Sequence, residues 1–184
     1  GASLLEVLRD RLGVRSAKDG CSPQGQCGCC TVWVDGQPRV ACVTPAARVA
    51  GRAVTTVEGM AEADDWARRL CATGGSQCGF CTPGIVMRLA AIPPERRDDA
   101  TVRQALLANL CRCTGWNTIV DAAVGAADER PRDLAAAARR AAIEGGAAQM
   151  VSPEVALGRG GFAADTAPLD ALVAVRAADG TWAV

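Results

Sequence analysis

Hydrophobic and polar residues near the start of the chain repeat first at the period of a helix and then at the period of strands. The segment 3–12, SLLEVLRDRL, opens with the serine and glutamate of a capping box, which predicts a helix that Gly13 ends. Its four leucines are expected on one buried face: Leu4, Leu5, Leu8 and Leu12. Residues 31–34 and 39–43 flank Asp35-Gly36, a dipeptide typical of primed turns, and predict a β-hairpin. Residues 54–57 are a further strand candidate.

Between residues 60 and 130 the pattern changes to that of helices. Most predicted segments begin at an aspartate or a threonine–proline pair and place apolar residues at intervals of three and four. The predicted helices run from Asp64 or Asp65 to about Cys71, from Thr82 to Ala90, from Val102 to Leu110 after a cap at Asp98 or Asp99, and from Asn117 to Ala127. This part of the chain is therefore predicted to be a helical bundle.

The pattern weakens after residue 130. Residues 133–144 are rich in alanine and predict one more helix, and residues 171–175 and 181–184 predict a terminal hairpin. Between them, short apolar runs are separated by glycine and proline, and some forty residues of this kind cannot bury a core of their own. The tail after Gly145 is therefore expected to lie along a partner subunit.

Composition narrows the classes of function. The 184 residues are 49% hydrophobic but include only four tryptophans, two phenylalanines and no tyrosine, so the core has few large side chains. Twenty basic residues balance twenty acidic ones, which argues against nucleic acid or an anionic membrane as the partner. No apolar run approaches the roughly eighteen residues of a membrane span. Histidine is absent, which excludes Rieske clusters, histidine-bound zinc and histidine acid–base chemistry within these residues.

Eight of the ten cysteines form two sets of four with the spacing of metal ligands. The first set is Cys21, Cys27, Cys30 and Cys42, and the second set is Cys78, Cys81, Cys111 and Cys113. The predicted hairpin returns Cys42 toward Cys30, and the cysteines at 27, 29 and 30 are too crowded for separate disulfides. Four thiolates at one point suit either a zinc ion or an iron–sulfur cluster.

Two [2Fe–2S] clusters in series are favoured over two zinc sites. Zinc sites usually combine two similar knuckles, whereas the two sets differ and the first begins with the awkward spacing Cys21-x5-Cys27. Glycines at 20, 25 and 28 can turn backbone N–H groups toward the sulfurs of a reduced cluster. The positive end of the helix at 82–90 would favour the thiolates of the second set. Two alternatives stay open: a structural protein with two four-cysteine zinc sites, and a stand-alone ferredoxin-type carrier.

Two cysteines are left over. Cys29 is interpreted as a bystander that packs as a small hydrophobe, with substitution for a ligand as the alternative. Cys71 is expected to be buried on its helix.

Four motifs in the same order resemble one known family. GCSPQGQCGCCTVWVDG, VTTVEG, QCGFCTPGIVM and NLCRCTGW are similar to the iron–sulfur small subunit of the molybdenum hydroxylases, which include xanthine dehydrogenase, aldehyde oxidase and carbon monoxide dehydrogenase. The similarity runs from about Ser3 to Ala127. It implies an α+β fold with a ferredoxin-like β-grasp domain at 1–60, a four-helix domain at 61–130, and a helix and extended tail at 131–184. Each of the first two domains would hold one cysteine set and one [2Fe–2S] cluster.

The resemblance also implies a function. The chain would be the electron-transfer subunit of an oxidoreductase and would carry no catalytic residue. Electrons would pass from a molybdopterin cofactor in a large subunit, through both clusters, to FAD in a medium subunit. Gln77 matches the family glutamine that contacts the pterin, and Cys113 matches the ligand nearest to it. A heterotrimer or its dimer is expected, in the cytoplasm unless an export signal precedes Gly1.

The sequence departs from the family pattern in three places. The first cysteine pair encloses five residues instead of four, which predicts a bulge at Ser22-Pro23. The family has two β-strands before its first helix, so either further residues precede Gly1 or another chain completes the sheet. The tail after about Arg130 lies outside the shared motifs.

Overall fold

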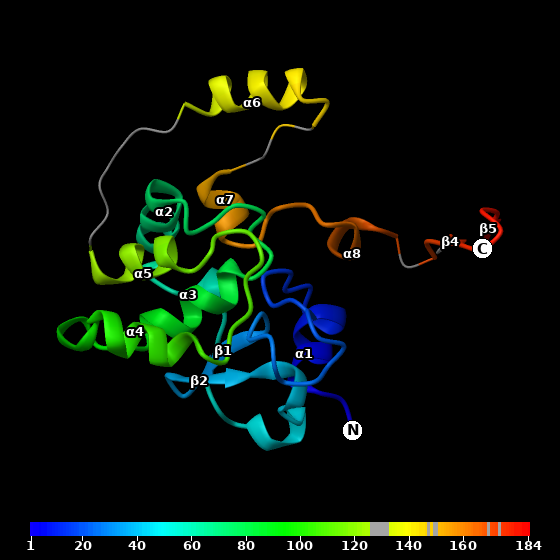
Figure 1. Cartoon of the computed structure of the whole chain (residues 1–184). Coiled ribbons are helices and arrows are strands. Elements are labelled where there is room, and N and C mark those ends of the chain that lie inside the picture. Colours follow the sequence, from blue (N-terminus) through cyan, green and yellow to red (C-terminus); the bar gives the residue numbers. More distant parts are fainter. Residues whose placement is uncertain (126–132, 147, 149–150, 169, 173) are drawn as a thin grey trace.

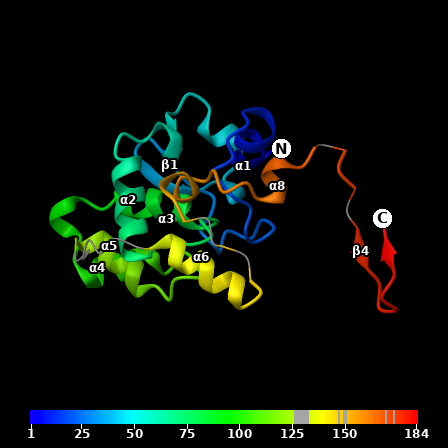
Figure 2. The ribbon, with the colours of Figure 1, turned by 90° about the horizontal axis from the view of Figure 1, so that it is seen from above.

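The computed structural model describes residues 1–125, 133–146, 148, 151–168, 170–172 and 174–184. Short helices pack against one small sheet, and a C-terminal segment crosses this body and ends in a hairpin that stands apart from it (Figure 1). The view from above shows the same separation of the hairpin (Figure 2). Within the described part, no helix is long and apolar enough to cross a membrane.

The first helix begins as the sequence predicts. In α1 (Leu4–Glu6), the Glu6 carboxylate accepts from the Ser3 N–H at 2.6 Å and the Ser3 hydroxyl accepts from the Glu6 N–H at 3.2 Å, so the capping box is confirmed. Residues Val7–Arg11 continue as a π-helix, whose wider turn rotates Leu12 away from the other leucines. Leu12 is 66% exposed, so its expected place on the buried face is wrong.

The predicted hairpin is present and forms the centre of the sheet. β1 (Thr31–Val34) and β2 (Gln37–Val40) pair antiparallel, and β3 (Val54–Thr55) pairs antiparallel with the other edge of β1. Asp35 and Gly36 have φ angles of 49° and 73°, the two positive values of a primed turn.

Two strands end earlier than predicted. The second strand stops at Val40 because the chain bends toward Cys30: the Ala41 N–H donates to the Cys30 carbonyl at 3.2 Å, and Ala41–Val43 form a 3-10 turn. The third strand stops at Thr55 and is followed by a 3-10 turn at Val57–Gly59. Further 3-10 turns lie at Ala46–Val49 and Pro94–Arg96.

Four helices follow the sheet. They are α2 (Ala63–Thr73), α3 (Thr82–Ala90), α4 (Asp99–Leu106) and α5 (Asn117–Val124). Asp98 caps α4 by accepting from the Thr101 N–H at 2.7 Å, which is one of the two caps that the sequence predicts. Glycines in the left-handed conformation end α2 and α5.

Four helix boundaries differ from the prediction, and one of them is the start of α4, which lies at Asp99 instead of Val102. α2 begins at Ala63, so the aspartates at 64 and 65 lie in its first turn, near the positive helix end, instead of capping it. α4 ends at Leu106 instead of Leu110, because the Leu110 N–H donates to the Cys27 carbonyl at 3.0 Å and leaves the helix. α5 ends at Val124, and the predicted end at Ala127 lies outside the described residues.

Buried side chains form two clusters. One lies between α1 and β1 and comprises Leu4, Leu5, Leu8, Ala17, Cys30, Val32, Val34, Ala41 and Cys42. The other lies among the helices and includes Trp66, Leu70, Ile85, Val86, Met87, Val102, Ile119 and Val120. α3 packs against β1, where the Trp33 ring N–H donates to the Met87 carbonyl at 2.7 Å. This contact ties the sheet to the helices.

Part of the tail packs on the chain itself. α6 (Leu134–Ile143) is present as predicted, and none of its side chains is buried. α7 (Pro153–Ala156) packs against α2 and buries Val155 and Ala156, and α8 (Ala163–Thr166) follows.

The chain ends in a hairpin across the predicted turn, formed by β4 (Val175–Arg176) and β5 (Trp182–Ala183), whose side chains are exposed. The first strand begins at Val175, so its predicted start at residue 171 is wrong. Packing on a partner subunit stays a prediction for this end of the tail.

Candidate metal centre

The cysteines of the first set come together as two pairs of thiols. The side chains of Cys21 and Cys27 lie close enough to shift each other's pKa, and the Cys42 side chain helps to raise the pKa of Cys30. Cys21 is half-buried and the other three are buried. The second pair forms because the hairpin and the turn at Ala41–Val43 return Cys42 to Cys30, as predicted.

Backbone N–H groups point at the sulfurs of this set. The Gln24 N–H donates to the Cys21 sulfur at 3.3 Å, and the Cys42 N–H donates to the Cys30 sulfur at 3.4 Å. Burial raises the pKa of Cys21, but N–H groups from Gln26, Cys27 and Gln24 outweigh it and lower that pKa to about 7. Burial raises the pKa of Cys30 to about 12. Thiolates in this loop would therefore find donors already in place.

The extra residue in the first cysteine spacing is absorbed where the bulge was predicted. Ser22 has a φ of 55°, which is unusual for a residue other than glycine, and its N–H donates to the Asp19 carboxylate at 2.8 Å. The loop bends at Ser22 and still brings Cys21 to Cys27.

The second set also forms two pairs. The Cys113 thiol donates to the Cys78 sulfur at 3.4 Å, and the side chains of Cys81 and Cys111 lie close enough to shift each other's pKa. Cys78 and Cys113 are exposed, Cys111 is half-buried and Cys81 is buried at the start of α3. Gln77, half-buried, precedes the exposed pair.

The cysteines of the second set differ in their pKa values. The Cys81 thiol lowers the pKa of Cys111 to about 5 by donating to its sulfur, and the Thr114 hydroxyl, 3.1 Å away, adds to this effect. The same bond, together with burial, raises the pKa of Cys81. Burial raises the pKa of Cys113. A metal must displace the remaining protons, since thiolates are the ligands.

The two sets meet at backbone contacts. Besides the hydrogen bond from Leu110 to Cys27, a Cβ on Gly84 of α3 would stand only 2.2 Å from the Gly28 carbonyl oxygen. Asn109 lies beside Gly28, is 3% exposed, and neither its amide nitrogen nor its amide oxygen has a hydrogen-bond partner among the described residues. Neither Gly84 nor Asn109 was predicted from the sequence to lie at this contact. For Gly84, the sequence does carry one signal, which is a glycine in the first turn of a predicted helix.

The two leftover cysteines differ in their surroundings, and the Cys29 side chain lies beside that of Cys27. Cys29 is 3% exposed, and burial raises its pKa; its thiol lies 3.6 Å from the Cys27 carbonyl oxygen. Its role as a bystander stays a prediction. Cys71 is half-buried on α2, so it is more exposed than expected.

The donor sets fit a binuclear cluster. Each set offers two pairs of thiols, and a [2Fe–2S] cluster takes four cysteine thiolates shared between two irons. Across the part of the chain that the structure covers, no group of three or more Cys, Asp or Glu side chains is arranged to hold one metal ion.

Comparisons with known proteins address the family directly. Residues 56–124 match the family described as the [2Fe-2S] binding domain. The xanthine dehydrogenase iron-sulfur-binding subunit of Escherichia coli O157:H7 is 39% identical over 128 residues, which cover 66% of this chain and 79% of that subunit. The chain belongs to the family of iron–sulfur subunits of xanthine dehydrogenase-type oxidoreductases. The predicted resemblance is confirmed, and the chain is a non-catalytic subunit or part of such an enzyme.

Longer relatives contain the same iron–sulfur unit as one part. The aldehyde oxidoreductase of Megalodesulfovibrio gigas is 41% identical over 135 residues, and the match spans 68% of this chain but only 15% of that protein. The structure of the aldehyde oxidoreductase from Desulfovibrio desulfuricans ATCC 27774 matches 96% of this iron–sulfur subunit and 22% of that chain, with a TM-score of 0.70 and 31% identity. The mixed fold of helices and a small sheet, with a [2Fe–2S]-binding domain, is therefore confirmed.

Proposed function

We propose that this iron–sulfur subunit passes electrons from a molybdopterin cofactor in a large partner subunit, through two [2Fe–2S] clusters, to FAD in a medium partner subunit. Residues 1–60 would form the β-grasp domain and residues 61–130 the four-helix domain, each with one set of four cysteine ligands. When bound, each cluster would accept and release one electron. A heterotrimer, or its dimer, would be the working enzyme.

The observation that carries this proposal is the pairing of the thiols. Eight cysteines that are spread over residues 21–113 converge as four pairs, two in each set. The N–H groups of Gln24 and Cys42 would stabilise the negative charge on the first set. The Thr114 hydroxyl would do the same for Cys111 in the second.

The contact between the sets supports a serial order. Leu110 precedes a ligand of the second set, and its N–H donates to the carbonyl of Cys27, a ligand of the first. Covalent bonds and this one hydrogen bond therefore join the two centres. On the outer side, the exposed sulfurs of Cys78 and Cys113 leave the second set open to a partner's cofactor. Gln77 and Cys113 would contact the pterin there.

The proposal is tested on the anaerobically purified enzyme with its partner subunits, reduced by sodium dithionite. Two distinct cluster signals are expected in electron paramagnetic resonance. The variant Cys113→Ala is expected to lose the signal of the second set, and Cys42→Ala that of the first, while each keeps the other. A colourless protein that contains zinc, or one signal lost equally in both variants, would refute the assignment.

Electron routing needs a second measurement on the same variants. With Cys113→Ala, flavin reduction driven from the molybdenum subunit is expected to stop. Flavin reduction at the normal rate in that variant would contradict the serial order, even if both clusters were present in the unmodified protein.

A further inference from the structure

Residues 152–166, which we call the strap, contact both cysteine-bearing parts of the subunit. In Figure 1 the strap runs from α7, beside α2, across to α8 near α1, and Figure 2 shows α8 again beside α1. A Cβ on Gly79 would stand 2.4 Å from the Val155 carbonyl oxygen, and one on Gly158 would stand 2.7 Å from the Ser16 Cα. The strap therefore touches the loop inside the second cysteine set and the segment that leads into the first.

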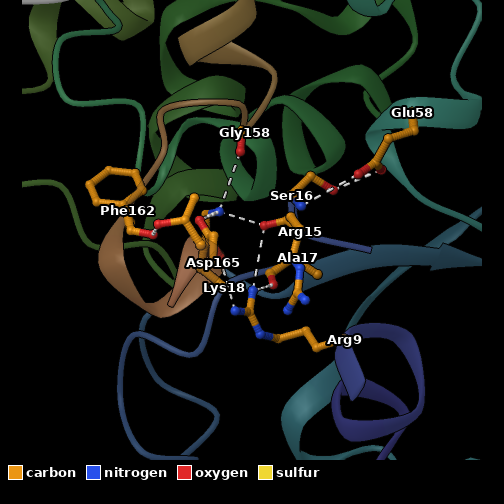
Figure 3. A network of polar contacts seen from close by, with 10 residues as sticks. Arg9, Arg15, Ser16, Ala17, Lys18, Glu58, Gly158, Phe162 and Asp165 are labelled. Carbon is orange, nitrogen blue, oxygen red and sulfur yellow. Dashed lines mark hydrogen bonds and ion pairs between the residues drawn. The ribbon is translucent and has the colours of Figure 1, made fainter. Parts of the chain in front are cut away.

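A buried network of charges holds the strap to that segment. Lys18, the only lysine of the chain, is 2% exposed, and its ammonium group pairs with the Asp165 carboxylate (Figure 3). The other oxygen of that carboxylate accepts from the Arg9 guanidinium at 2.9 Å. Arg9 also donates to the Ala17 carbonyl at 2.7 Å. A buried ammonium group that loses its carboxylate is strongly disfavoured, so the position of Lys18 depends on Asp165.

The position of Lys18 affects the loop that carries the first cysteine set. Its backbone N–H donates to the Cys29 carbonyl at 3.2 Å, between the ligand pairs, and the chain continues within three residues to Cys21. Displacement of Lys18 would therefore move the loop that carries the first set.

An aromatic contact holds the strap to the second set. The rings of Phe162 and Phe80 meet edge to face with centroids 5.1 Å apart, and the Lys18 ammonium lies 5.5 Å from the Phe162 centroid. Phe80 lies between Cys78 and Cys81, and its other side faces Gly20, where a Cβ would stand 3.2 Å from the Phe80 ring.

We propose that the strap sets the spacing of the two cysteine sets, with Asp165 as its positioning residue. The proposal rests on the proposed electron transfer, because it concerns the distance between the two centres. Asp165 holds the segment before the first set, and Phe162, three residues earlier, holds the loop inside the second. One short stretch of chain thus determines both positions.

The test compares Asp165→Asn, Asp165→Glu and the control Asp170→Asn, each in the enzyme with its partner subunits. Asp170 is exposed in the same tail. The first readout is the magnetic splitting between the two dithionite-reduced clusters, which depends on their distance and orientation. The second is amide hydrogen exchange in residues 15–21. Asp165→Asn is expected to change the splitting and to speed exchange at least about tenfold, because the segment loses its anchor. Asp165→Glu is expected to restore both toward the wild type, and Asp170→Asn to leave both unchanged.

Equal splitting and equal exchange in Asp165→Asn and Asp170→Asn would overturn the strap proposal, while two cluster signals in both would leave the proposed function standing. If Asp165→Asn does not accumulate as folded protein, Phe162→Leu replaces it, because this change keeps the ion pairs and removes the contacts of the ring with Phe80 and with the Lys18 ammonium. A wild-type splitting in Phe162→Leu would then count against the proposal, and an altered one would support it.

Discussion

Replacing Gly84 by alanine is expected to push α3 away from the loop of the first cysteine set. A Cβ at this position would stand 2.2 Å from the Gly28 carbonyl oxygen and 2.9 Å from the Cys29 Cα. Ordinary contacts of a Cβ begin at 3.4 Å, so the two segments must separate by about 1 Å. Both neighbours are backbone atoms, and no side-chain rotation can relieve the overlap.

The expected magnitude follows from two opposing effects. Alanine is favoured over glycine inside a helix by about 0.5–1 kcal/mol. Overpacking of a well-packed interior costs about 1–3 kcal/mol, and contact with backbone places this case at the upper end, so the net loss of unfolding free energy is about 2 kcal/mol. The matched control is Gly59→Ala, where the Cβ would meet only the Thr55 methyl carbon at 3.7 Å. Its expected change is within about 0.5 kcal/mol.

The assay is guanidinium unfolding of the anaerobic protein, followed by circular dichroism for the helices and by visible absorption for the clusters. The magnetic splitting between reduced clusters is measured on the same samples. Gly84→Ala should unfold at lower denaturant and show an altered splitting. Unfolding and splitting indistinguishable from those of Gly59→Ala would refute the close contact between α3 and the first loop.

Two further substitutions test neighbouring features. Cys29→Ala is expected to keep both clusters, and its free energy of unfolding is expected to fall by about 1 kcal/mol because the thiol fills space in the core. Iron and sulfide analysis measures the number of clusters, and loss of one cluster would identify Cys29 as a ligand. Trp33→Phe removes the ring N–H that donates to the Met87 carbonyl, and the free energy of unfolding, measured with denaturant, is expected to fall by about 1 kcal/mol. Wild-type stability of this variant would show that the bond does not tie the sheet to the helices.

Features that depend on a few neighbouring residues could be predicted from the sequence. The capping box at Ser3 and the primed turn at Asp35-Gly36 follow from local backbone chemistry, and both are present. The family motifs are local as well, because each ligand pair of the type Cys-x-x-Cys or Cys-x-Cys lies within a single turn or loop. The paired arrangement of the sulfurs was not predicted, since it depends on how separate loops meet.

Features that depend on distant residues could not be predicted. The apolar pattern predicts that α4 continues to Leu110, whereas the hydrogen bond from Leu110 to Cys27 takes the chain out of the helix. The sparse apolar residues of the tail predict packing on a partner subunit and give no sign of its contacts within the chain. The ion pair between Lys18 and Asp165 spans 147 positions of sequence, and neither composition nor period carries information about such a pair.

The junction between the cysteine sets is built from backbone contacts, and this has a consequence for function. The chain has few large side chains, and where the sets meet, Gly28 lies against the Ala108 carbonyl and Gly84 lies against the Gly28 carbonyl. A side chain can adopt another rotamer when its neighbour shifts, but two backbone segments in contact can only move together or separate. Such a junction holds the distance between the centres constant while burying little area. Electron transfer between two sites needs a constant distance more than a large interface, so small residues at the junction are an advantage for a subunit of this kind.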